Sequence, residues 1–123
     1  MLRYMGYLGH HEFGLDHRPF RFHGAPLPEE VPEKIEYWLR IWCDTHDWLL
    51  EQSGCGIMPL CYDSLVEDPR RWSRVAELAG AAEPPDGAEE LKRRAPSPRP
   101  EADPALLGRA EDIYRTLRSR SLV

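Results

Sequence analysis

The sequence predicts an α/β protein in which helices predominate, and three observations lead to this prediction. The first is a long stretch with apolar residues at helical spacing, the second is a short apolar run that follows it, and the third is a pair of Asp-Pro dipeptides. We expect helices at about residues 29–52, 69–79, 88–94 and 104–119, and one clear strand at about residues 57–62.

The first expected helix follows a segment rich in proline and acidic residues, from Pro26 to Pro32. Proline fits the first turn of a helix, where its missing N–H is not needed. Apolar and aromatic side chains then recur at offsets of three and four, and these are Ile35, Trp38, Leu39, Trp42, His46 and Leu49. Tyr37, Ile41 and Trp48 widen the stripe, so we expect this helix to be buried on two sides.

The expected strand is the run from Ile57 to Tyr62, in which Pro59 removes one ladder donor and favours an edge position. Only Pro19 to His23 offers a second alternating segment. One or two strands do not make a stable sheet, and unpaired buried backbone groups cost free energy. We therefore expect the partner strands to come from an amino-terminal half outside this sequence.

The two Asp-Pro pairs, Asp68-Pro69 and Asp103-Pro104, predict the later helices because aspartate caps a helix and proline suits its first position. Gly80 is expected to close the first of these helices. Between them, residues 81–103 form a proline-rich connection that we expect to cross the surface. The 123 residues are close to the length of one ordinary domain, so a single domain is expected.

Composition excludes several classes of function. A net charge of -5 disfavours a nucleic-acid surface, which needs clustered lysine and arginine. The sequence has neither an apolar run of the roughly 18 residues that span a bilayer nor a signal-peptide core, so a cytoplasmic location without membrane contact is expected. The three cysteines are odd in number and lack a Cys-x-x-Cys pair, which favours free thiols.

The histidines near the start are the most reactive group of side chains. His11-Glu12 begins a His-Glu-x-x-His pattern, but Leu15 stands where the second ligand would be, so no metal site is predicted. A neutral imidazole here would suit a base or a hydroxyl contact, and a structural or surface role is the competing interpretation. The only lysines, Lys34 and Lys92, do not follow a glycine-rich phosphate loop, so neither catalytic nor cofactor-binding residues are predicted.

The residues Leu60-Cys61-Tyr62-Asp63-Ser64-Leu65-Val66-Glu67-Asp68-Pro69, continuing to Val75-Ala76-Glu77-Leu78-Ala79-Gly80, resemble the Tyr-Glu-Asp-Leu region late in bacterial sulfotransferases that use 3'-phosphoadenylyl sulfate. In that region of the family a strand leads through a loop into a helix that ends in glycine. Here Cys61 replaces the family's usual arginine, and Asp63-Ser64 replaces Glu-Asp. The resemblance extends backward to residues 33–52 and forward to residues 110–117. The second of these segments is similar to the closing helix of bacterial members.

This resemblance implies a P-loop-type α/β fold and transfer of a sulfuryl group to a hydroxyl or amine of a small-molecule acceptor. The family's phosphosulfate loop, base and 3'-phosphate motif have no counterpart here, so the chain is expected to be an incomplete carboxy-terminal region that is inactive alone. It would need a complementing amino-terminal half or a homo-oligomer, and 3'-phosphoadenylyl sulfate would bind only the complete enzyme. Residues 1–28 would form an acceptor-side segment, with His10, His11 and Phe13 as candidate substrate-binding residues.

The alternative hypothesis is a small non-catalytic module that binds a protein partner through the aromatic helix. Three of the chain's four tryptophans, Trp38, Trp42 and Trp48, lie in this helix, and Trp72 lies in the next one. Aromatic side chains often anchor protein interfaces, although helical spacing also suits packing in a core.

Overall fold

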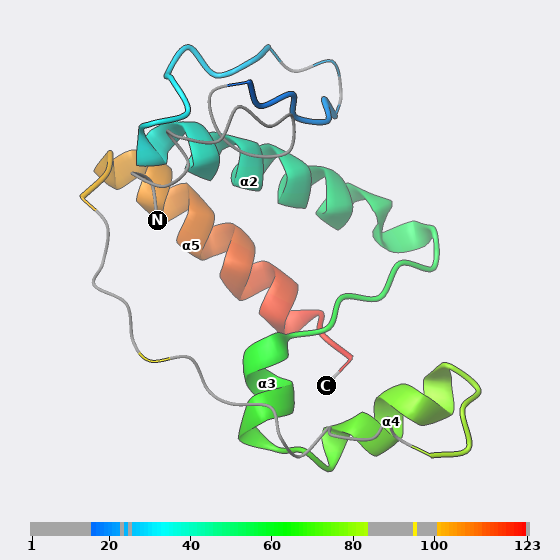
Figure 1. Ribbon diagram of the computed structural model, residues 1–123. Coiled ribbons are helices and arrows are strands. Elements are labelled where there is room, and N and C mark those ends of the chain that lie inside the picture. Colours follow the sequence, from blue (N-terminus) through cyan, green and yellow to red (C-terminus); the bar gives the residue numbers. More distant parts are fainter. Residues whose placement is uncertain (1–15, 23, 25, 84–94, 96–100, 123) are drawn as a thin grey trace. The chain divides into compact units, whose positions relative to one another are not determined.

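The computed structural model of the chain describes residues 16–22, 24, 26–83, 95 and 101–122 (Figure 1). Its elements are α2 (Ile35–Glu51), the short 3-10 helix η1 (Gln52–Gly54), α3 (Tyr62–Glu67), α4 (Arg71–Leu78) and α5 (Pro104–Ser119). The chain divides into two compact units. The first unit contains Met1–Ile57 with Arg99–Arg115, and the second contains Met58–Pro98 with Thr116–Val123.

The first unit is built on α2 and the adjoining part of α5, which lie side by side (Figure 1). Among the residues that the structure describes in this unit, the buried hydrophobic ones are Tyr37 and Cys43 of α2 and Leu106 and Ile113 of α5. The helix α5 begins as expected, because a carboxylate oxygen of Asp103 accepts a hydrogen bond from the backbone N–H of Leu106 at 2.8 Å.

The helix α2 begins at Ile35, six residues later than position 29, where the sequence placed it. The prolines explain the delay. Pro32 has no backbone N–H, and the preceding segment closes a turn in which the N–H of Lys34 donates to the carbonyl of Val31 at 2.9 Å. The indole of Trp38 then donates to the Pro32 carbonyl at 2.7 Å and ties this turn to the helix.

Burial of α2 on two sides was also expected, and every residue from Ile35 to Leu50 is buried or half-buried. Tyr37 and Cys43 are the fully buried residues of this helix. The tryptophans of α2 are half-buried, and part of their cover comes from the preceding loop. Phe22 stacks on Trp48 with ring centroids 4.6 Å apart, and the ring of His17 lies 4.7 Å from that of Trp38.

The second unit contains α3, α4, the end of α5 and the residues that follow it. Among its described residues, Cys61, Ser64, Leu65 and Ala76 are buried. The helix α4 ends as the sequence predicted. Gly80 has a φ of 73°, the N–H of Ala81 bonds the carbonyl of Ala76, and the N–H of Gly80 bonds that of Glu77. This hydrogen-bond pattern is a Schellman motif, which satisfies the last carbonyls of a helix.

The predicted α/β class and the strand at 57–62 are wrong for the described residues, which contain helices and no strand. Tyr62 instead begins α3, and the residues just before it bond with the end of the chain. The N–H of Leu122 donates to the Pro59 carbonyl at 3.1 Å, and the N–H of Cys61 donates to the hydroxyl of Ser121 at 2.9 Å. These bonds satisfy backbone groups that a neighbouring strand would otherwise occupy.

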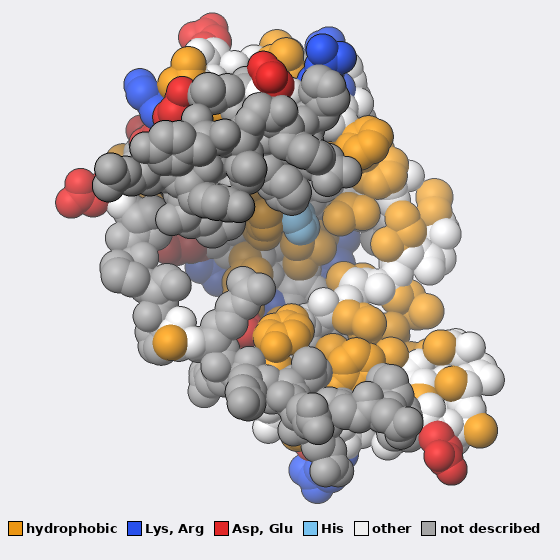
Figure 2. Space-filling view, viewed as in Figure 1, with side chains coloured by type: hydrophobic (Ala, Val, Ile, Leu, Met, Phe, Trp, Pro, Cys, Tyr) orange, Lys and Arg blue, Asp and Glu red, His pale blue; other side chains and the backbone are white. Residues whose placement is uncertain are grey.

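Three of the four expected helices correspond to α2, α4 and α5, and the fourth, at 88–94, lies outside the described residues. No helix in the described part of the chain has the length and apolar character to cross a bilayer. Hydrophobic side chains reach the surface in both units (Figure 2). Whether the chain is one independently folding domain stays a prediction.

Candidate functional site

The first unit holds a histidine whose ring is fixed by neighbouring aromatic residues. Nδ1 of His17 lies 2.8 Å from the hydroxyl of Tyr37, which is only 5% exposed. The His17 ring meets the Tyr37 ring edge-on, with centroids 5.6 Å apart, and tilts over Trp38. Tyr37 and Trp38 lie in the first turn of α2, so the start of this helix positions the imidazole.

Burial changes the titration of both partners in this pair. It lowers the pKa of His17 and raises the pKa of Tyr37, because removal from water penalises the charged form of each. Both side chains are therefore neutral at pH 7, and one O–H or N–H proton lies in the bond between them. Nδ1 is occupied by Tyr37, which leaves Nε2 as the ring nitrogen that can bind another group.

A hollow of about 380 Å³ lies beside this histidine in the first unit. Its lining is mainly apolar and consists of His17, Arg18, Pro19, Phe20, Phe22, Ile41 and Thr45. Ile41 and Thr45 are four residues apart on α2 and so share one face of that helix. The loop residues supply the remaining walls, and Phe20 is 89% exposed at the rim.

We expect the His17 pair to make stability depend on pH. Because folding lowers the pKa of His17, the unfolded chain binds more protons as the pH falls below about 7, so stability rises as the pH is raised through the range below the ordinary pKa of histidine. His17→Gln, which cannot titrate, should flatten that rise. The check is the urea midpoint of both proteins at several pH values; an unchanged pH dependence in the variant would contradict the assignment.

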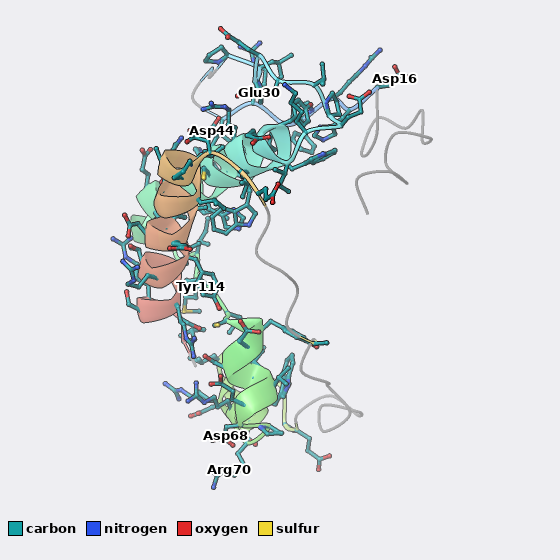
Figure 3. All side chains as sticks on the ribbon, turned by 90° about the vertical axis from the view of Figure 1, so that its left-hand side faces the viewer. Asp16, Glu30, Asp44, Asp68, Arg70 and Tyr114 are labelled. Atoms are coloured by element: carbon teal, nitrogen blue, oxygen red, sulfur yellow. The ribbon has the colours of Figure 1, made fainter. Side chains whose placement is uncertain are left out.

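A second hollow in the first unit, of about 430 Å³, is lined by five charged residues together with Pro26, Leu27 and Pro28. Nε of Arg40 donates to the two oxygens of Glu30 at 2.8 and 3.0 Å. Arg109 of α5 donates to Asp44 at 3.2 Å and to Asp47 at 2.5 Å. Glu30 and Asp44 are labelled in Figure 3.

The arginines of this hollow are neutralised by the carboxylates beside them. Hydrogen bonding to Arg40 lowers the pKa of Glu30, and hydrogen bonding to Asp47 raises the pKa of Arg109. An anionic ligand would have to break these pairs before it could use either guanidinium. The cluster is best explained as an ion-pair network that holds α5 against α2 within the first unit.

Arg109→Ala is expected to lower the free energy of unfolding by roughly 1 kcal/mol, since it removes contacts to two half-exposed carboxylates. The loss should shrink at high ionic strength because salt screens such pairs. Arg115→Ala is the matched control. It breaks a pair with Asp112 within one helix, where both side chains are more than 70% exposed, and should change little. Equal losses from the two substitutions, measured by urea unfolding, would refute a bracing role for Arg109.

The predicted substrate-binding residues His10, His11 and Phe13 lie outside the described residues. His17 was not among the predicted site residues, and its pairing with Tyr37 was not predicted. Among the described residues, no three His, Cys, Asp or Glu side chains gather as a metal site would require. No simple sequence signal links His17 to Tyr37, because the contact spans twenty positions.

Comparison of the chain with protein-family models, with curated proteins and with solved structures found no match.

Proposed function

We propose that this chain is the acceptor-side part of a sulfotransferase and acts together with a separate polypeptide that binds the phosphosulfate group. The observation that carries the proposal is the sequence from Leu60 to Gly80, which resembles the late Tyr-Glu-Asp-Leu region of bacterial sulfotransferases. The glycine-closed helix α4 fits that pattern, since the corresponding family helix ends in glycine. The family region also contains a strand before this helix, and the described residues contain none. The proposal therefore concerns the function of the chain and does not include the predicted sheet.

In the proposed reaction an acceptor oxygen or nitrogen forms a bond to the sulfur of 3'-phosphoadenylyl sulfate. The sulfur–oxygen bond to the phosphate breaks, adenosine 3',5'-bisphosphate leaves, and the acceptor's proton passes to a base. Cations and backbone N–H donors would stabilise the transferring group. Because the sequence has no phosphate loop, the partner polypeptide would supply these donors, and this chain would contribute acceptor contacts.

The test uses the chain alone and the chain co-produced with the polypeptide encoded directly upstream. The chain alone should show no rise in melting temperature with adenosine 3',5'-bisphosphate, whereas a complex that binds this product should show one, since a ligand that binds only the folded state stabilises it. The complex should also release adenosine 3',5'-bisphosphate when given the sulfuryl donor and a hydroxyl acceptor. A folded complex without release would contradict the proposal.

A second candidate function is a non-catalytic protein-binding module. Large apolar side chains are exposed just before and within α3, with Met58 at 52%, Leu60 at 44% and Tyr62 at 45%. Apolar side chains grouped in this way can anchor a partner. A chain that melts cooperatively, ignores the nucleotide and gives no sulfuryl transfer in any complex would favour this alternative.

A further inference from the structure

We propose that the hollow beside His17 is a binding site for a small single-ring aromatic molecule that carries one hydroxyl group. Its apolar walls would cover the ring, and Nε2 of His17 would hydrogen-bond the hydroxyl. All residues of the site belong to the first unit, so this proposal stands whether or not the chain takes part in sulfuryl transfer.

The size and lining of the hollow point to this class of ligand. At about 380 Å³ it lies near the lower end of the range of ligand pockets, ~300–1,000 Å³. The aromatic rings of Phe20 and Phe22 provide faces and edges for offset stacking. Arg18 adds a cation, which favours the face of an aromatic ring. A hollow lined mainly by carbon does not suit a strongly charged ligand.

His17 is one of the residues that line the hollow, and its bond to Tyr37 fixes the imidazole ring. Tyr37 holds Nδ1 at 2.8 Å, and the rings of Tyr37 and Trp38 restrict how the imidazole can turn. A pocket that has apolar walls and a fixed hydrogen-bonding atom selects a ligand with one polar group. If Tyr37 donates to Nδ1, then Nε2 carries a proton and donates to the ligand hydroxyl; in the other tautomer Nε2 accepts from it. In either tautomer Nε2 can hydrogen-bond a hydroxyl group of the ligand, whereas it cannot hydrogen-bond a methyl group in the same place.

The experiment titrates phenol and toluene into the full chain and follows methyl signals by ¹³C NMR. Ile41 and Thr45 line the hollow and should shift with both ligands, whereas the methyl groups of Leu65 in the second unit should not. The variant His17→Phe keeps an aromatic ring against Trp38 but removes Nε2. In this variant the affinity for phenol relative to toluene should fall by about fivefold, which is the change expected from the loss of one hydrogen bond.

Phe20→Ala is the companion variant. Phe20 is 89% exposed, so the substitution should leave the fold intact and weaken both ligands without changing their ratio. This variant keeps the proposal testable if His17→Phe fails to fold. The proposal would be overturned if phenol left Ile41 and Thr45 unshifted, if Phe20→Ala bound both ligands as tightly as the wild type, or if a folded His17→Phe kept the wild-type ratio.

Discussion

Leu106→Ala is expected to destabilise the first unit by about 2–5 kcal/mol, because it removes buried methyl groups and leaves a cavity. Leu106 is 5% exposed in α5 and is one of few buried hydrophobic side chains among the described residues of that unit. A protein of this size has a total stability of only about 5–15 kcal/mol, so one such loss is a large part of the whole. The urea midpoint, followed by far-ultraviolet circular dichroism, measures the effect.

Leu27→Ala is the matched control for this substitution. It makes the same chemical change in the same unit, but Leu27 is 54% exposed, and its loss should cost well under 1 kcal/mol. If Leu106→Ala does not fold, the milder Ile113→Val, at a buried position of the same helix, should cost about 0.5–1.5 kcal/mol. Similar midpoints for the two leucine variants would show that Leu106 is not in a packed core.

The helices could be predicted from the sequence because their signals are local. Asp103 caps α5 through a residue three positions away, and Gly80 closes α4 through bonds within its last turn. The strand could not be predicted in the same way. An apolar run such as Ile57 to Tyr62 becomes a strand only beside another strand, and in the described residues its neighbours are Ser121 and Leu122.

The candidate site was less predictable because it depends on contacts between distant residues. The carboxylates Asp44 and Asp47 were not predicted as part of a site, because their partner Arg109 lies more than sixty positions away. His17 likewise gains its fixed orientation only when the loop folds back on Tyr37. Composition identified histidine as a reactive residue type, but the choice among the five histidines depends on tertiary contacts.

The three cysteines are expected to react with a thiol reagent at very different rates. Cys43 is 0% exposed and burial raises its pKa, whereas Cys55 is exposed. The thiolate is the reactive form, so Cys43 should react only when the first unit opens. If opening costs about 5 kcal/mol, labelling of Cys43 should be slower than that of Cys55 by nearly four orders of magnitude, roughly 5,000-fold. Mass spectrometry of iodoacetamide-treated protein measures each rate, and equal rates would contradict the burial of Cys43.

The same labelling tests whether the two units unfold together. Cys61 is buried in the second unit at 9% exposure, so it reports on that unit as Cys43 reports on the first. Leu106→Ala weakens the first unit and should therefore accelerate labelling of Cys43 while leaving the exposed Cys55 unchanged. A single cooperative domain requires Cys61 to accelerate in parallel, because its exposure would then depend on the same unfolding event. Acceleration of Cys43 alone would instead mean that the two units open independently and that the single-domain prediction is wrong.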